Sequence, residues 1–186
     1  MTTAIRALVM SSLLLAGCRQ ETYPPIALAD NVDLARFMGD WYVIANIPTF
    51  IEEGAHNAVE SYSIAPDSTI ETVFTFRAGS FDGKRKRYTP RGFVREGNGN
   101  AVWGMQFVWP VKADYRIAWL SPDYSQTVIG REARDYVWIM ARTPEIPDSD
   151  YDGILEFLKS QGYDLAKIRK VPQRWPDEPS PPERSK

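Results

Sequence analysis

The feature that most constrains the fold is a series of short strand-like segments separated by turn residues. Many of them alternate, so that every second side chain shares one face of the strand. In the third segment, Ile70, Thr72 and Phe74 share a face in this way. Because every connection is short, segments that are neighbours in sequence are expected to pair as antiparallel neighbours in space. The eight segments are 41–47, 58–64, 69–77, 84–96, 101–108, 114–120, 124–130 and 136–142. They predict an all-β, eight-stranded antiparallel up-and-down barrel, which is wide enough to hold one small ligand.

The periodicity changes after this series. Pro144 and Pro147 end the last strand, and Asp148 is a residue type that caps helices. Apolar residues then recur at helical spacing, which predicts one amphipathic helix packed outside the barrel and ending at Gly162: Tyr151, Ile154, Leu155 and Leu158. Residues 167–171 could add a short extra strand, and the five prolines of 172–186 predict a disordered tail.

Composition narrows the classes of function. The chain has 186 residues, enough for one domain, and its formal charge of −2 makes nucleic acid an unexpected partner. His56 is the only histidine and Cys18 the only cysteine, so we expect no metal site, no cofactor and no histidine- or cysteine-based catalytic set. The chain is therefore predicted not to be an enzyme. A weak lipid-modifying enzyme that uses carboxylates alone is left as an alternative.

The N-terminus carries the pattern of an export signal. Arg6 is followed by an apolar stretch, which is too short to span a bilayer and ends in Leu15-Ala16-Gly17-Cys18. This ending resembles the bacterial lipobox, which implies a signal peptide at 1–17, acylation of Cys18 and a tether at 18–30. Arg19 after the cysteine implies sorting to the outer membrane, with the protein facing the periplasm. The alternative is an ordinary signal peptide with an incidental cysteine.

Three motifs far apart in sequence should meet at one end of such a barrel. Gly39 precedes the first strand and Trp41 begins it, Asp123 and Tyr124 form the turn before the seventh, and Arg142 ends the eighth. In an up-and-down barrel these three places lie at the same end. We therefore expect the guanidinium of Arg142 to lie across the indole of Trp41 as a cation–π contact.

These motifs resemble the signature of the lipocalin family, in particular its bacterial outer-membrane lipoproteins and their apolipoprotein D-like relatives. The resemblance covers residues 34 to about 171, within a predicted domain at 31–171. The chain departs from the family pattern in Ser121-Pro122 and in the proline-rich tail. It implies that the motif residues are structural. It also implies storage or transport of a fatty acid or lysophospholipid in an apolar cavity, with the membrane as partner through the acyl anchor. A homodimer is left open, as is a structural envelope protein with a filled barrel.

Alternation along the strands predicts which side chains face the ligand, although a slip of one residue would invert each face. The predicted lining is Ala58, Tyr62, Ile70, Phe74, Val94, Trp103, Met105, Phe107, Tyr115, Ile117, Trp119 and Trp138. The open end would be formed by the loops 49–57, 78–83, 108–112 and 131–135.

Three features are expected near that end, and the first two have two interpretations each. Glu60 shares the face of Ala58 and Tyr62, but a solvated position is favoured because Glu is rarely buried. The basic run 84–87 suits an anionic head group or, preferably, a solvated strand end. Trp109, in a short loop with Pro110, could be a lipid-facing anchor at the same end.

Overall fold

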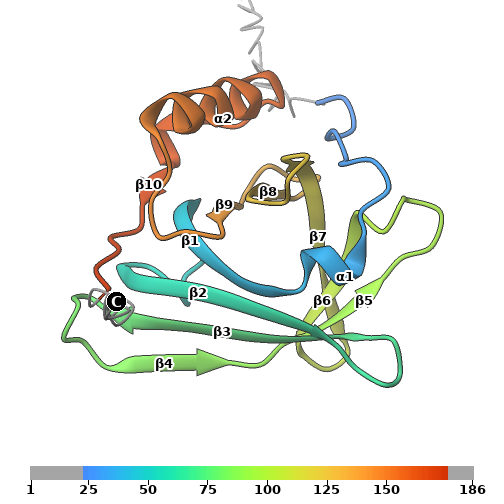
Figure 1. Ribbon diagram of the computed structural model, residues 1–186, viewed down its shortest axis with the longest axis horizontal. Helices are drawn as coiled ribbons and strands as arrows, with labels where there is room; N and C mark the ends of the chain where they lie inside the picture. Colours follow the sequence, from blue (N-terminus) through green and yellow to red (C-terminus); the bar gives the residue numbers. More distant parts are fainter. Residues whose placement is uncertain (1–22, 176–186) are drawn as a thin grey trace, which may run out of the picture.

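The chain folds as a closed antiparallel barrel with one helix packed outside it (Figure 1), as predicted. The computed structural model describes residues 23–175. Each strand pairs with its neighbour, and β9 returns to β1 to close the barrel, with Tyr42 opposite Ala141 and Ile47 opposite Val137. The strands are β1 (Gly39–Ile47), β2 (Ala55–Ile64), β3 (Ile70–Ala78), β4 (Arg85–Tyr88), β5 (Arg91–Val94), β6 (Val102–Val108), β7 (Val111–Leu120), β8 (Gln126–Gly130) and β9 (Val137–Ala141).

The fourth strand of the barrel is interrupted. The predicted segment 84–96 forms two short strands, β4 and β5, which both pair with β3. The break falls at Pro90, which has no N–H to donate to the ladder, while its carbonyl accepts a hydrogen bond from the Thr72 N–H. The two pieces together fill one place in the barrel, so the prediction of eight strands is confirmed.

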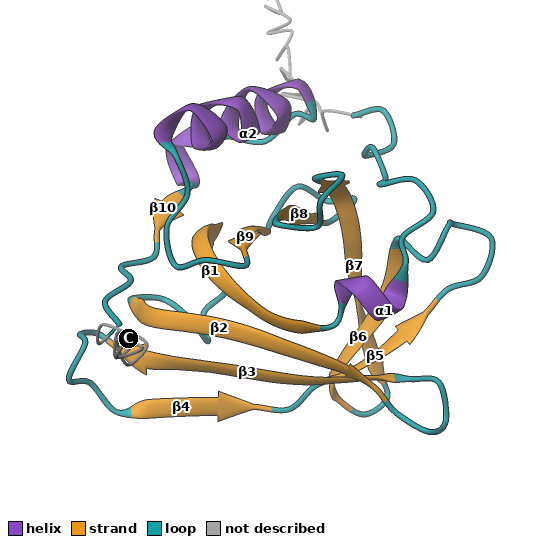
Figure 2. Cartoon of the chain, in the orientation of Figure 1, coloured by secondary structure: helices purple, strands orange, loops and turns teal. Residues whose placement is uncertain are grey.

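Two apolar clusters lie on opposite faces of the sheet. The inner one fills part of the barrel and includes Trp41 and Trp103. The outer one lies under α2 (Asp148–Ser160), where Ile154 and Leu158 are buried against the barrel wall. Figure 2 shows α2 lying across the outside of the barrel, apart from the short α1 (Leu34–Phe37) that precedes β1. The predicted amphipathic helix is thus confirmed.

The segment before α1 is packed on the barrel, which corrects the described part of the predicted tether. Ile26 is 3% exposed, and the Ala29 N–H donates to the Ile117 carbonyl at 2.9 Å. The carbonyl of Pro24 accepts a hydrogen bond from Arg134 in the β8–β9 loop (131–136). Apolar side chains at 26, 28 and 29 have a surface to bury against, so residues 23–30 are not a free linker.

The chain after α2 also returns to the barrel. It passes through a 3₁₀ turn (Leu165–Lys167) into β10 (Arg169–Lys170), which pairs with β1 where β2 has moved away. This confirms the predicted extra strand. The following residues are hydrogen-bonded too, since the Gln173 amide donates to the Val43 carbonyl at 2.8 Å and the Arg174 N–H to the Asn57 side chain at 2.7 Å. The described start of the predicted disordered tail, 172–175, is therefore packed.

Several predictions fall on parts of the chain outside the described residues. These are the signal peptide, the acylated Cys18 and the tail after residue 175. Within residues 23–175, no helix has the length and apolar character needed to cross a membrane.

Candidate functional site

One end of the barrel is closed by packed aromatic rings. Trp41 and Trp103 are fully buried there, and Phe37 from α1 lies between them, with ring centroids 5.0 and 5.5 Å away. The Trp41 indole N–H donates to the Phe37 carbonyl at 2.8 Å, so the large ring keeps a partner for its only polar atom. α1 was not predicted, yet it supplies the ring that completes this plug.

Arg142 ties the closed end together. Its guanidinium carbon lies 3.7 Å from the centroid of the Trp41 ring, which confirms the expected cation–π contact. Its Nη1 and Nη2 groups donate to the carbonyls of four residues at 2.7–3.0 Å, and its Nε donates at 3.4 Å to the carbonyl of Tyr124. The four are Arg36, Phe37, Met38 and Asp40. One side chain therefore satisfies backbone groups of α1, β1 and the β7–β8 turn.

The β7–β8 turn brings the motif of Asp123 and Tyr124 to the same end. Asp123 forms hydrogen bonds only within its own turn. The Asp123 carboxylate accepts hydrogen bonds from the hydroxyls of Ser121 and Ser125, and these lower the pKa of Asp123 to about 2. Tyr124 makes the contact between segments, because its hydroxyl accepts the Asp33 N–H at 2.9 Å and the Arg36 guanidinium lies over its ring. Ser121 also accepts two backbone N–H groups of the turn, so this departure from the family pattern is structurally satisfied.

Gly39 is placed where only glycine fits without strain. Its φ is +93°, a conformation that side chains rarely adopt, and a Cβ there would lie 3.4 Å from Nη1 of Arg142. The positive φ therefore requires glycine for the sharp entry into β1, while a Cβ would make only an ordinary contact with the arginine.

The other half of the barrel is hollow. A cavity of about 430 Å³ opens between the ends of the strands, within the size range of small-molecule sites. Its lining is mostly apolar, and it comprises Thr49, Phe50, Ile51, Glu52, Glu60, Thr72, Phe74, Pro90, Met105, Phe107, Val108, Val111, Ala113, Asp114, Tyr115, Arg131, Tyr136 and Trp138.

The predicted lining residues fall into three groups. Five lie on the cavity wall: Phe74, Met105, Phe107, Tyr115 and Trp138. Six belong to the packed interior instead, where most of them fill the barrel beside the closed end: Ala58, Tyr62, Ile70, Val94, Trp103 and Ile117. Trp119 is on the wrong face, because it packs in the outer cluster under α2. The register of β7 shifts between Ile117 and Trp119, so alternation counted along the sequence fails at that point.

Three carboxyl groups line the cavity. Asp114 pairs with Arg116, and of the two glutamates, Glu52 and Glu60, sequence reasoning missed the first. Glu52, in the β1–β2 loop, is 4% exposed and accepts from the Trp138 indole N–H at 3.0 Å and from Thr49. Its burial raises its pKa. The only signal for Glu52 was its place in a loop expected at the open end.

Glu60 lies inside the barrel, which corrects the preference for a solvated position. It accepts a short hydrogen bond from the Tyr62 hydroxyl, which in turn lies 2.7 Å from the Tyr115 hydroxyl. Burial, helped by the charge of Glu52, raises the pKa of Glu60 to about 8, so it is mostly protonated at neutral pH. Burial also raises the pKa of Tyr115 well above its usual value. The sequence signal was the alternation shared with Ala58 and Tyr62.

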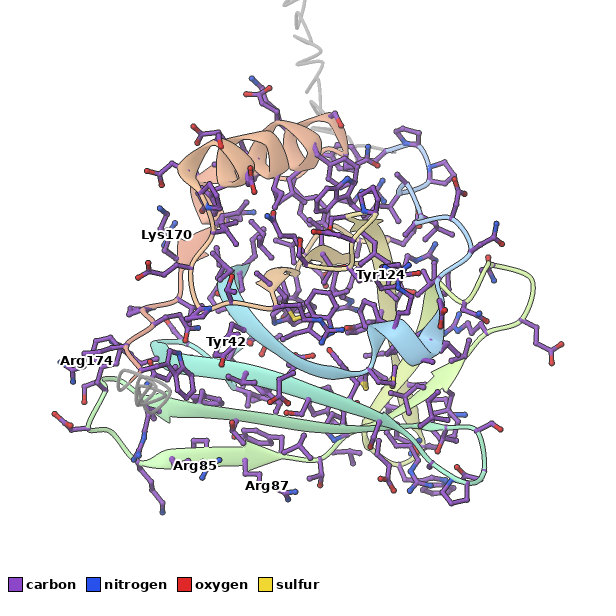
Figure 3. All side chains as sticks on the ribbon, in the orientation of Figure 1. Tyr42, Arg85, Arg87, Tyr124, Lys170 and Arg174 are labelled. Atoms are coloured by element: carbon purple, nitrogen blue, oxygen red, sulfur yellow. The ribbon has the colours of Figure 1, made fainter. Side chains whose placement is uncertain are left out.

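Large apolar side chains are exposed around the cavity opening. Phe50 is 88% exposed, Trp109 82% and Val108 72%, and Phe107 and Val111 on the same β6–β7 hairpin are also exposed. The basic run lies along β4, and Figure 3 shows Arg85 and Arg87 directed away from the barrel. His56 lies near the start of β2, where its ring contacts the Gly54 carbonyl and the Phe81 ring.

A barrel that is plugged at one end, tied by an arginine over a tryptophan, and hollow at the other defines a small β-barrel of the ligand-binding type. Residues 32–173 match the family model described as a lipocalin-like domain. The chain therefore belongs to the lipocalin family, whose members generally bind small hydrophobic ligands and are typically not enzymes.

Named relatives agree with this assignment. Temperature-induced lipocalin-1 of Arabidopsis thaliana is 30% identical over 155 residues, which cover 77% of this chain and 80% of the relative. The outer membrane lipoprotein Blc of Escherichia coli K12 is 26% identical over 178 residues, which cover 90% of this chain and 94% of the relative. Among solved structures, insecticyanin from the tobacco hornworm Manduca sexta superposes with a TM-score of 0.63 at 14% identity, covering 80% of this chain and 85% of insecticyanin.

Proposed function

We propose that this protein binds a single-chain lipid, of the fatty acid or lysophospholipid type, in the barrel cavity and stores or transports it at the outer membrane. The observation that carries the proposal is the apolar cavity of about 430 Å³ above a packed floor. An acyl chain buried there would gain up to about 0.8 kcal/mol per methylene before ordering costs. The same cavity argues against a structural protein with a filled barrel.

The proposed location rests on the N-terminus and on the relatives. One of them is an outer membrane lipoprotein that matches nearly the whole chain. The apolar side chains around the cavity opening suit a protein that meets lipid, since Trp and other large side chains favour the membrane interface.

Filling the cavity is expected to weaken lipid binding. Ala113 lines the cavity on β7, and the neighbouring Lys112 lies on the outer side, over the Phe93 ring. Ala113→Trp should weaken lipid binding about tenfold or more, because displacing two buried methylenes already costs that much. Lys112→Trp is the matched control and should bind normally. Titration with lysophosphatidylcholine and with monoacylglycerol measures both, and equal affinities would mean that the lipid sits elsewhere.

Replacing Cys18 tests the anchor. In bacteria fed labelled palmitate, the wild-type protein should carry label and be processed, whereas Cys18→Ser should carry none and accumulate as the unprocessed precursor. Acylation precedes cleavage in lipoproteins, which is why both changes should occur together. Ser11→Ala, in the apolar part of the signal, is the control and should behave as wild type. Normal processing of Cys18→Ser would establish an ordinary signal peptide.

A further inference from the structure

The cavity holds two carboxyl groups that no cation balances. Glu60 lies on the wall near the packed floor and Glu52 nearer the opening, and both line the same hollow. Their hydrogen-bond partners are neutral donors, Tyr62 for Glu60 and Trp138 with Thr49 for Glu52. Within residues 23–175, neither carboxyl forms an ion pair, and Oε1 of Glu60 accepts no hydrogen bond from the chain. Each group is therefore left with capacity for a charged donor.

The other titratable groups around the cavity do not supply that donor. Arg131 is the one cationic side chain in the described lining, and its Nη1 pairs with Asp135 at 3.0 Å while its guanidinium lies over the Tyr136 ring. Asp114 pairs with Arg116, and Tyr115 faces Glu60 through Tyr62. The cavity thus presents unneutralised carboxyl groups together with aromatic faces.

Electrostatics then discriminates between ligand head groups. A carboxylate head would bring a like charge beside Glu52 and would oppose any ionisation of Glu60, because like charges repel strongly where water is scarce. An ammonium head would supply the missing donor as a charge-assisted hydrogen bond, and it would be attracted to the faces of Trp138 and Tyr115. A neutral hydroxyl head would gain neither benefit and suffer no repulsion.

We infer that this cavity selects single-chain amphiphiles that carry an amine cation over those that carry a carboxylate. The inference rests on the proposed function, since it assumes that a lipid enters the cavity, and it specifies the head group of that lipid. On binding, the protonated carboxyl of Glu60 releases its proton to solvent and the carboxylate pairs with the ammonium. The ammonium keeps its own proton, so one proton leaves for each ligand bound.

The test compares three ligands with one chain length. Dodecylamine, dodecanol and dodecanoate displace the neutral fluorescent probe N-phenyl-1-naphthylamine from the mature protein at pH 7. We expect the amine to bind tighter than the carboxylate by about tenfold to hundredfold, the range of a charge-assisted hydrogen bond, with the alcohol between them. Because binding releases a proton from Glu60, amine affinity should rise from pH 6 to pH 8, by up to about tenfold per unit.

Variants locate the head group. Glu60→Gln should reduce the amine preference and its pH dependence if the head lies at the floor, and Glu52→Gln should do so if the head lies at the opening. Glu53→Gln, one residue from Glu52 but exposed, is the matched control and should keep the wild-type preference. Thermal unfolding of each variant at pH 7 shows that the barrel is intact.

The outcomes separate this inference from the proposed function. If dodecanol binds but the amine is no tighter than the carboxylate, or if both glutamine variants keep the preference, the inference is wrong and the lipid-binding proposal stands. If none of the three ligands displaces the probe, both are wrong.

Discussion

Glu60→Gln is expected to stabilise the protein strongly at alkaline pH and hardly at all at pH 4. In the folded state the pKa of Glu60 is about 8, against 4.5 in the unfolded chain. The folded protein therefore holds a proton that the unfolded chain has lost, and its stability falls as the pH rises from 4.5 to 8. The full difference amounts to roughly 5 kcal/mol well above pH 8, and the neutral glutamine would not lose this stability.

Urea unfolding of wild type and variant at pH 4, 6, 8 and 9 measures this effect. The two stability curves should nearly coincide at pH 4 and diverge steadily up to pH 8, then run parallel. Glu53→Gln serves again as the exposed control, and its curve should follow the wild type throughout. A wild-type stability that does not change between pH 5 and pH 8 would show that Glu60 is ionised in the folded barrel.

Arg142→Ala is expected to cost the fold about 3–5 kcal/mol, because it leaves several carbonyls at the closed end without a donor and removes the cation from the Trp41 face. The cavity lies at the other end of the barrel and does not include Arg142 in its lining. Lipid affinity, measured below the unfolding temperature, should therefore change much less than the melting temperature.

Two further variants provide melting temperatures with which that of Arg142→Ala can be compared. Arg142→Lys keeps the charge but presents one donor group in place of a planar fork, so it should fall between alanine and wild type. Arg85→Ala removes an exposed arginine that is directed away from the barrel, and it should leave the melting temperature unchanged. If Arg142→Ala melts like Arg85→Ala, the closed end does not depend on this side chain.

The barrel and its closed end could be predicted from sequence because both depend on local patterns. Alternation and turn residues define each strand, and chain order alone then brings Trp41, Tyr124 and Arg142 to one end. The cavity wall was less predictable. The boundary between the packed closed end and the hollow half of the barrel depends on how aromatic rings from α1 and four strands fit together. Trp119 shows a second limit, since a register shift in β7 reverses alternation without a signal in the residue types.

The position of Glu60 and the packing of the described residues 23–30 and 172–175 were missed for a different reason. General expectations, that Glu is solvated and that a tether or a proline-rich tail stays free of the barrel, were overruled at these residues by particular partners. Tyr62 gives Glu60 a buried donor, and the Asn57 and Val43 backbone and side-chain groups capture residues 172–174. Such partners come from distant parts of the chain or from the barrel interior, so they can be identified only from the folded structure.

The packing of residues 23–30 on the barrel also limits how far the barrel could move from a membrane to which Cys18 is attached. From Cys18 to Tyr23 there are five residues, which reach at most about 17 Å when fully extended. Pro24, next along the chain, is held by Arg134, and the same loop contributes Arg131 and Tyr136 to the cavity wall. If Cys18 is acylated, as proposed, the acyl group would therefore attach only a few residues from the loop that forms part of the cavity wall. The cavity opening would then stay close to the membrane to which the protein is attached.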